Sequence, residues 1–279
     1  TMNNYEKLEG MVAATFTPLD ENGDVNLSVI DKYADWIAST PIKGVFVCGT
    51  TGEFSSLTID ERKLILEKWL VSARKRFKVI AHVGSNCQRS AMELARHAAQ
   101  VGADAIASIA PSFFKPGTVD ELVDFFAPIC HSAAGLPFYY YNMPSITGVN
   151  LPVDKFLVEG KKKIPNLVGT KFTHNNLMEM GVCIELEQHR FEVLHGYDEI
   201  LISGLAMGAV AGVGSTYNYI PNVYQAIFDS MKMNDLETAR HNQIKSIRTV
   251  EVIIKYGGGV RGGKAIMKLI GIDCGSCRL

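Results

Sequence analysis

The chain has 279 residues, is 47% hydrophobic and 20% charged, and carries a formal net charge of −1. This balance is typical of a globular protein, and it excludes a strong overall field that would attract nucleic acid or an anionic membrane. No apolar run approaches the ~18 residues of a membrane span, and the first residues lack the apolar stretch of a secretory signal. Six scattered cysteines are typical of reduced thiols in a chain of this length. We therefore expect a cytoplasmic protein.

Short apolar segments alternate with helical patterns from residue 11 to about residue 215. Strands are predicted at 11–15, 44–48, 79–83, 105–109, 138–141, 167–171, 191–194 and 211–214. Helices are predicted at 27–40, 58–77, 90–101, 119–132, 177–187 and 200–207, and a further one begins at Pro152, where proline suits the first turn. Thr58 and Glu61 form a predicted capping box at the start of the second helix.

The predicted strands are continuous apolar runs, which indicates burial on both faces and hence a parallel sheet. Eight strand–helix repeats most simply close into a (β/α)8 TIM barrel of the α/β class. An open doubly wound sheet is the alternative, but no G-x-G-x-x-G follows the first strand. Three more helices are predicted at 224–233, 236–255 and 264–269. We expect residues 1–220 to form the barrel and carry the active site, and residues 221–279 to form a C-terminal helical extension packed on it.

Two strand ends carry residues suited to Schiff-base chemistry. Tyr141 ends the fifth predicted strand and Lys171 ends the sixth, and the carboxyl ends of barrel strands carry the chemistry in this fold. A lysine amine must be neutral to attack a carbonyl, and removal from water favours the neutral form of an amine. A tyrosine beside it can donate and accept protons. The alternative is that Tyr141 is a core aromatic and Lys171 a solvated strand end.

Three other strand ends carry polar groups. The glycines and hydroxyls of residues 49–53, GTTGE, are suited to bind a carboxylate, with a plain turn as the alternative. Residues 196–199, GYDE, place two acids together, but no histidine–carboxylate set stands at metal-ligand spacing nearby. Asp198 could also cap a helix, which is compatible with one acid facing the mouth of the barrel. Residues 214–218, GSTYN, place a hydroxyl after the eighth strand.

Two tempting motifs are rejected. Residues 258–264, GGVRGGK, nearly spell a phosphate-binding loop, but Ala265 follows and no strand precedes them, so we interpret them as a glycine-rich hinge between helices. Cys274 and Cys277 have zinc-like spacing without a second pair. The histidines lie apart, with no defensible serine–histidine–aspartate order. We expect no metal site.

Taken together, GTTGE after the second strand, YNMP after the fifth and the lysine of GTKFT on the sixth resemble the pyruvate-dependent class I aldolases, the N-acetylneuraminate lyase and dihydrodipicolinate synthase family. The resemblance covers essentially the whole chain. It implies a homotetramer of eight-stranded barrels without a metal or organic cofactor. By this match Lys171 forms the Schiff base, Tyr141 relays protons, and Thr50 and Thr51 bind the pyruvate carboxylate.

Two positions favour the lyase branch of the family. Dihydrodipicolinate synthases carry an arginine two residues after the proline of the YNxP motif, where this chain has Ile146, and an aliphatic side chain cannot replace a bidentate guanidinium. HGYDE followed by GSTYN resembles the lyases, in which these residues bind the polyhydroxyl tail of a sialic acid. The match assigns the sugar end to Thr173, Gly196, Asp198, Glu199 and Ser215. Many relatives have a tyrosine in the loop after the fourth strand, where this chain has residues 112–115, SFFK.

The resemblance implies a reversible retro-aldol cleavage of N-acetylneuraminate into N-acetylmannosamine and pyruvate. The partners are then small molecules and other copies of the chain, with no nucleic acid and no membrane. One alternative is another pyruvate aldolase, acting on a 2-keto-3-deoxy sugar acid. A catalytically silent keto-acid-binding barrel is a second alternative, because fold does not fix function.

Overall fold

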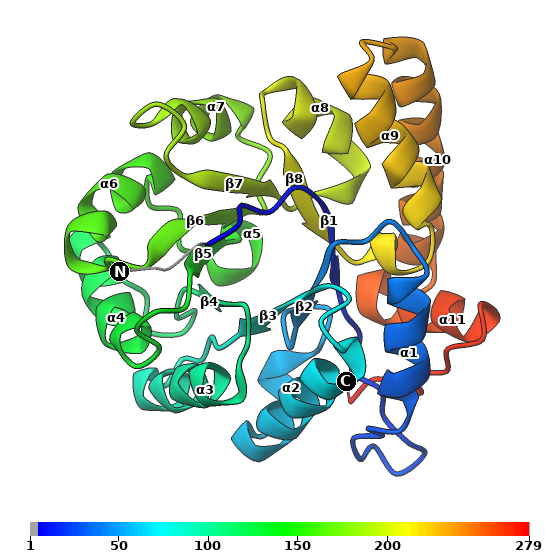
Figure 1. The fold of residues 1–279 in the computed structure, drawn as a ribbon, viewed down its shortest axis with the longest axis horizontal. Coiled ribbons are helices and arrows are strands. Elements are labelled where there is room, and N and C mark those ends of the chain that lie inside the picture. The colour runs from blue at the N-terminus through cyan, green and yellow to red at the C-terminus, as the bar shows by residue number, and fades with distance from the viewer. Residues whose placement is uncertain (1–4, 279) are drawn as a thin grey trace.

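Eight parallel strands close into one barrel in the computed structural model, which describes residues 5–278 (Figure 1). Each strand pairs with its neighbour in sequence, and β1 closes the barrel by pairing with β8. The strands are β1 (Gly10–Ala14), β2 (Gly44–Val47), β3 (Lys78–His82), β4 (Ala105–Ile109), β5 (Phe138–Asn142), β6 (Leu167–Phe172), β7 (Glu192–His195) and β8 (Ala211–Gly214). The predicted TIM barrel is confirmed, and the doubly wound alternative is wrong.

Helices surround the barrel in the order that the sequence predicts, with one short additional helix, α5 (Figure 1). They are α1 (Val29–Ala38), α2 (Ile59–Ala73), α3 (Gln88–Val101), α4 (Val119–His131), α5 (Pro144–Thr147), α6 (Val153–Lys163), α7 (Leu177–Glu185), α8 (Leu201–Ala206), α9 (Pro221–Lys232), α10 (Leu236–Lys255) and α11 (Gly258–Leu269). Short 3-10 turns are η1 (Phe54–Ser56), η2 (Asp198–Ile200) and η3 (Thr216–Asn218). The capping box of Thr58 and Glu61 is present at the start of α2. No helix within residues 5–278 is long and apolar enough to cross a membrane.

Side chains on alternate strand positions fill two separate cores. Tyr139 and Tyr141 of β5 point into the barrel, where they join the interior core. Tyr140 between them points outward and packs against Phe126 of α4 and Phe156 of α6. This period of two along a strand is the geometric reason that successive aromatic residues serve different layers.

A bulge in β6 decides which way Lys171 points. Phe138 pairs with Leu167 but the next residue, Tyr139, pairs with Gly169, so Val168 is an extra residue on β6. Such an insertion resets the alternation of the strand. Val168 faces the interior core, and from Gly169 onward the register brings Lys171 opposite Tyr141.

The C-terminal helices lie outside the barrel, beside α1 and α8 (Figure 1). The interpretation of residues 258–264 as a hinge is wrong, because they lie in α11. Close packing explains two of these glycines: a Cβ at Gly262 would lie 2.8 Å from Ile253 Cγ2, and one at Gly263 would lie 2.4 Å from Phe16 Cζ. Gly257 and Gly258, both with positive φ, make the turn between α10 and α11.

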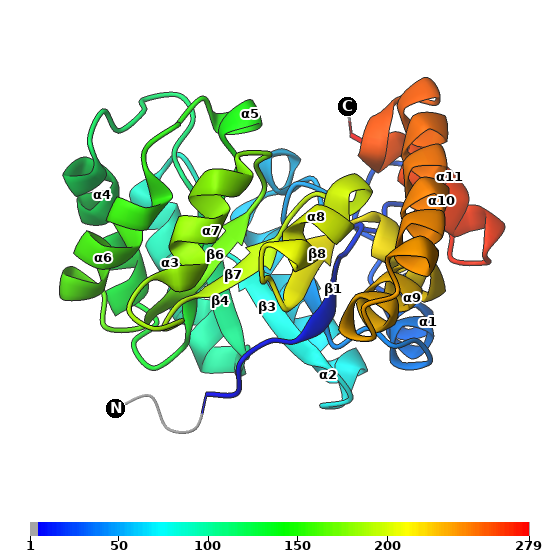
Figure 2. The same cartoon turned by 90° about the horizontal axis from the view of Figure 1, so that it is seen from above.

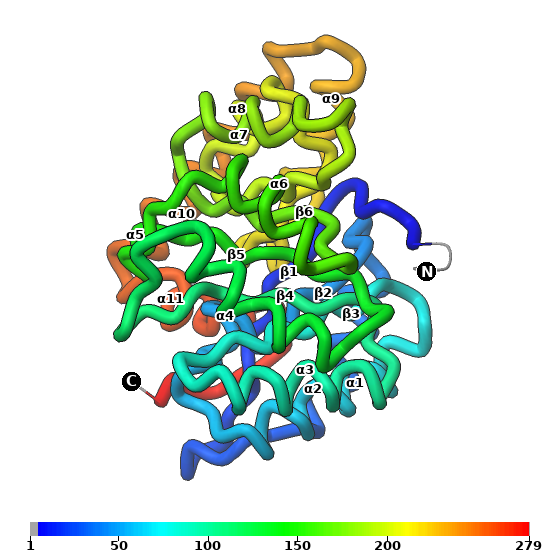
Figure 3. The backbone as a smooth tube through the Cα atoms, turned by 90° about the vertical axis from the view of Figure 1, so that its left-hand side faces the viewer, coloured from blue at the N-terminus to red at the C-terminus, as the bar shows by residue number. Residues whose placement is uncertain are grey.

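The two ends of the barrel differ in what covers them. Figures 2 and 3 show the N-terminal segment at one end of the barrel, and α5, α11 and the C-terminus at the other. The second end is the one at which the strands finish. In this fold it is the end that carries active sites.

We predict that Gly169→Ala destabilises the protein by about 1–3 kcal/mol, the usual cost of forcing atoms into a packed core. A Cβ at Gly169 would lie 2.0 Å from the backbone oxygen of Glu192 in β7. Gly259→Ala is the control, because its Cβ meets nothing within 4 Å and the position is helical. Urea unfolding should show a lower midpoint for the first variant alone. Equal midpoints for both variants would contradict the packing argument.

Candidate active site

One cavity of about 290 Å³ lies at the carboxyl ends of the strands. Residues from six strand ends reach it, those of β1, β2, β5, β6, β7 and β8. The structure brings together all nine residues that the sequence singled out: Thr50, Thr51, Tyr141, Lys171, Thr173, Gly196, Asp198, Glu199 and Ser215 line this cavity.

Lys171 and Tyr141 meet as direct neighbours across β5 and β6. Lys171 is only 4% exposed, so the alternative of a solvated strand end is wrong. Its Nζ lies 3.9 Å from the centroid of the Tyr141 ring and 4.4 Å from that of Phe46. The amine is therefore held against two aromatic faces at the inner wall of the cavity, where a bound carbonyl carbon could be attacked.

The Tyr141 hydroxyl lies between the second and fifth strand ends. It is 3.1 Å from Thr50 Oγ1 and 3.1 Å from the sulfur of Met143. Behind the ring, Phe46 and His82 make edge contacts with centroid separations of 5.7 and 5.8 Å. These contacts fix the ring, while the hydroxyl remains linked to the loop that carries Thr50.

His82 fixes the beginning of that loop. Its Nδ1 lies 2.8 Å from the carbonyl oxygen of Cys48, and its Nε2 accepts a hydrogen bond from Ile109 N at 3.2 Å. The carbonyl can only accept, so Nδ1 carries the proton. Burial lowers the pKa of His82 well below its usual range, which keeps this arrangement neutral. Arg62 donates to the carbonyl oxygens of His82 and Gly84 and holds the end of β3 in place.

The loop of residues 49–53 is a tight turn whose glycines are required by close contacts. A Cβ at Gly49 would lie 2.7 Å from Phe46 Cε1, and one at Gly52 would lie 3.0 Å from the Cα of Cys48. Within the described part of the chain, the backbone N–H groups of Thr50 and Thr51 have no hydrogen-bond acceptor. Free N–H groups and two hydroxyls at a cavity wall are suited to hold a carboxylate. The loop is therefore a tight turn that can also bind a carboxylate, so the two interpretations do not exclude each other.

Asp198 is buried at the cavity wall after β7. Its Oδ2 accepts hydrogen bonds from Thr216 N at 2.9 Å and from Thr216 Oγ1 at 2.5 Å. Its Oδ1 occupies the space beside Gly214, where a Cβ would lie 1.8 Å from that oxygen. Burial raises the pKa of Asp198 to about 7, against the hydrogen bonds from Thr216, which lower it. The predicted helix cap at Asp198 is wrong, because Tyr197 precedes η2 and Asp198 lies inside it.

Two C-terminal helices hold Asp198 in place. Thr216 Oγ1 contacts the hydroxyl of Tyr224 in α9, which lies 2.8 Å from Ser246 Oγ in α10. Ser246 Oγ and Gln243 Nε2 donate to the backbone oxygen of Asp198 at 3.3 and 3.0 Å. This closed network runs from the carboxyl group through two helices and back to the backbone of the same residue.

Thr173 and Gly196 lie side by side at the cavity wall, after β6 and β7. Thr173 Oγ1 is buried and has no hydrogen-bond partner among residues 5–278. A Cβ at Gly196 would lie 2.0 Å from this oxygen, so only glycine fits there. Glu199 and Ser215 are half-buried at the cavity wall. A buried hydroxyl without a partner is costly unless a ligand satisfies it.

Sequence reasoning missed part of the lining. Met143 and Thr216 lie inside the quoted motifs YNMP and GSTYN, so a systematic reading of motif neighbours would have found them. Tyr197 lies within GYDE in the same way. No sequence pattern indicates the lining residues of α10 and α11, because the sequence predicts these helices but not where they pack on the barrel. They are Val250, Ile253, Ile254, Gly259 and Val260.

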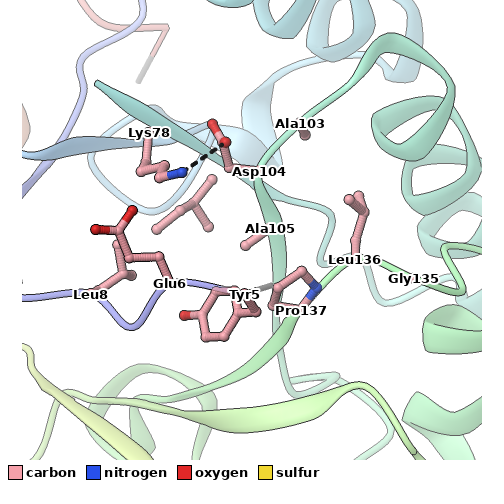
Figure 4. Close-up of a pocket in the computed structure, with 11 residues that line it drawn as sticks. Tyr5, Glu6, Leu8, Lys78, Ala103, Asp104, Ala105, Gly135, Leu136 and Pro137 are labelled. Carbon is pink, nitrogen blue, oxygen red and sulfur yellow. Dashed lines mark ion pairs between the residues drawn. The ribbon is translucent and has the colours of Figure 1, made fainter. Parts of the chain in front are cut away.

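A second hollow of about 250 Å³ lies at the opposite end of the barrel (Figure 4). Tyr5 and Pro137 line it, and Lys78 and Asp104 form an ion pair of 3.6 Å at its wall. None of the nine candidate residues reaches it.

The described residues contain no group of histidine, cysteine and acidic side chains that could hold a metal ion.

Residues 7–279 match the Dihydrodipicolinate synthetase family. The N-acetylneuraminate lyase of Mus musculus is 43% identical over 278 residues, which is 98% of this chain and 87% of that protein. The solved N-acetylneuraminate lyase of Aliivibrio salmonicida superposes with a TM-score of 0.96 at 38% identity, covering 98% and 91% of the two chains. The Proteus mirabilis N-acetylneuraminate lyase gives a TM-score of 0.95 at 37% identity, covering 98% and 92%.

We predict that the stability of the wild type falls relative to Asp198→Asn as the pH rises from about 4 to about 7, by about 1.4 kcal/mol for each pKa unit between the two states. The pKa of this carboxyl is 3.8 ordinarily and about 7 in the fold. Between these values the folded protein keeps a proton that the unfolded chain has lost, so rising pH favours unfolding. Urea unfolding of both proteins across this range provides the measurement.

Asp235→Asn is the control, because the pH dependence of its stability difference from the wild type should have the opposite sign. Hydrogen bonds from Thr238 lower the pKa of Asp235 at the start of α10. Its contribution is therefore present above the ordinary pKa and is lost as the pH falls. A free-energy difference between wild type and Asp198→Asn that stays constant across the window would contradict the buried-acid interpretation.

Proposed function

The chain belongs to the dihydrodipicolinate synthetase family, and we propose that it is a Schiff-base aldolase that reversibly cleaves N-acetylneuraminate into N-acetylmannosamine and pyruvate. The similarity to N-acetylneuraminate lyases along nearly the whole chain bears out the lyase branch and the enzyme class. The observation that carries the mechanism is the buried Lys171 beside Tyr141, in a cavity whose far wall is polar.

The pyruvate half of the substrate binds between Lys171 and the loop of Thr50 and Thr51. The two threonines and their free N–H groups hold the carboxylate. Lys171 Nζ attacks the C2 ketone of the open-chain sugar and expels water, which gives a protonated imine. The imine draws electrons from the C3–C4 bond. This half of the site is built entirely from the ends of β2, β5 and β6.

Tyr141 moves the proton that cleavage requires. Its hydroxyl takes the proton of the C4 hydroxyl and passes its own proton to the substrate carboxylate as the C3–C4 bond breaks, and N-acetylmannosamine leaves. The hydrogen-bond distance to Thr50 Oγ1 links this hydroxyl to the carboxylate-binding loop. The enamine that remains on Lys171 is then protonated and hydrolysed to pyruvate.

The sugar tail meets the polar wall after β7 and β8. Thr173, Gly196, Asp198, Glu199 and Ser215 are assigned to it, and the unpaired Thr173 hydroxyl supports the assignment. A carboxyl group that titrates near neutrality, as Asp198 does, can donate as well as accept a hydrogen bond. Sites built to hydrogen-bond hydroxyls discriminate sharply against substrates that lack them.

Two features support a homotetramer in the cytoplasm: exposed apolar side chains suit association, and free thiols suit a reducing compartment. Phe113 and Phe114 are 77% and 87% exposed and stack edge to face at 5.0 Å in the loop after β4, and Ile146 of α5 is 61% exposed. Exposed apolar clusters of this kind mark association surfaces. All six cysteines are free, which suits a reducing compartment. The division into a barrel of residues 1–220 and a helical extension of residues 221–279 is part of the same proposal.

We predict that pyruvate followed by borohydride adds a stable mass to Lys171, because an imine is reducible. Peptide mass analysis locates the adduct. Lys264 is the internal control, since it is also buried but lies in α11 and pairs with an acid. Lys171→Met should show no adduct. An adduct on another lysine, or none in the wild type, would overturn the proposed chemistry.

We predict that Tyr141→Phe slows carbon–carbon cleavage by about 10²–10⁴-fold, the usual range for a positioned acid–base group. Trapping of pyruvate on Lys171 should survive, because the ring that packs against Nζ remains. Ser215→Ala is the matched control: it should lower kcat/KM for the sialic acid by about 10-fold, the loss of one hydrogen bond to a hydroxyl. Near-normal turnover of Tyr141→Phe would move the proton relay to another group.

A further inference from the structure

Glu53 holds a backbone conformation that is unusual for its type. The residue ends the GTTGE loop with φ = 58° and ψ = 37°, the left-handed region that favours glycine. Glycine at this position would adopt it without steric cost. The presence of glutamate at position 53 is therefore explained by the contacts of its side chain and not by its backbone conformation.

The Glu53 carboxylate is bound at both oxygens by the last part of the chain. Oε2 forms an ion pair of 2.8 Å with Lys264 Nζ of α11, and the side chains of the two residues are 10% and 2% exposed. Oε1 accepts a hydrogen bond from Arg278 N at 3.1 Å. Buried charges persist in proteins when they are paired in this way.

Lys264 joins the loop of residues 49–53, here called the carboxylate loop, to the C-terminal tail, residues 270–278. Its Nζ also donates to the backbone oxygen of Ser276 at 2.7 Å. The tail is fixed in turn, because Leu19 N donates to the oxygen of Cys274 at 3.0 Å and the Arg278 guanidinium binds Glu61 at 2.6 Å. The anchor of Glu53 is therefore a rigid part of the fold.

The same loop carries the groups that meet the pyruvate carboxylate. Glu53 N donates to Thr50 O at 3.0 Å, and Phe54 N donates to Gly49 O at 3.2 Å. Thr50 Oγ1 reaches the Tyr141 hydroxyl. A shift of Glu53 would therefore move Thr50 and Thr51 and change the contact between Thr50 and the Tyr141 hydroxyl.

We propose that the buried ion pair between Lys264 and Glu53 is a positioning device for the pyruvate end of the site, by which α11 and the C-terminal tail set the place of Thr50 and Thr51. The inference rests on the proposed function for the identity of the ligand. Neither residue is needed in the chemistry. Their effect acts through the carboxylate loop, so it should fall on pyruvate and spare the sugar.

The test is the synthesis direction, in which the two substrates have separate KM values. Lys264→Met should raise the KM for pyruvate by about 10–100-fold, since misplacement by about 1 Å can cost 10²-fold, while the KM for N-acetylmannosamine stays within about twofold. The double variant Glu53→Gln/Lys264→Met removes the charge left unpaired in the single variant, and it should keep the raised KM for pyruvate. Lys232→Met is the control, because it breaks an exposed ion pair of 2.7 Å with Glu9.

A merely structural role would lower kcat by reducing the active fraction and leave both KM values unchanged. That result in the folded double variant would overturn the inference. Amide hydrogen exchange of residues 49–54 supplies a readout without substrate: exchange should speed up in the Lys264 variants and not in Lys232→Met, and unchanged exchange would also overturn it. A wild type that neither traps pyruvate nor condenses it would instead refute the proposed function, and the exchange result would then decide the inference alone.

Discussion

The register between β5 and β6 is the constraint on which the site depends. One extra residue on β6, Val168, brings Lys171 opposite Tyr141, whose side chain faces the barrel interior. A slip of one residue in a strand reverses the face of every side chain after it. Without the bulge, the amine would point into the helix layer. The lack of a side chain at Gly169 lets β6 approach the backbone of Glu192 in β7, where a Cβ would lie 2.0 Å from the Glu192 oxygen.

Two different parts of the molecule support the two halves of the cavity. On the pyruvate side, Lys171 and Tyr141 belong to neighbouring strands of one hydrogen-bonded barrel, and His82 fixes the adjacent loop. On the sugar side, Asp198 depends on Thr216 and on residues of α9 and α10. The reaction centre thus rests on the sheet, and the wall that faces the distal carbons rests on the C-terminal helices.

The sequence predicted the barrel and the strand-end residues because both have local signals. Apolar runs indicate buried parallel strands, and Lys171 and Tyr141 stand at their ends. Gly262 and Gly263 of α11 were misinterpreted because their cause is distant: Ile253 and Phe16 leave no room for a Cβ. The bulge at Val168 and the ion pair of Glu53 with Lys264 also depend on partners far along the chain. No local pattern encodes such contacts.

The position of the C-terminal tail determines when this site can form during synthesis. Domains fold from the N-terminus as the chain is made, and the strands that carry Tyr141 and Lys171 emerge from the ribosome before α11 does. The anchors of the carboxylate loop, Lys264 and Arg278, follow all eight strands in the sequence. A nascent chain can therefore order its barrel strands before the carboxylate loop gains both anchors.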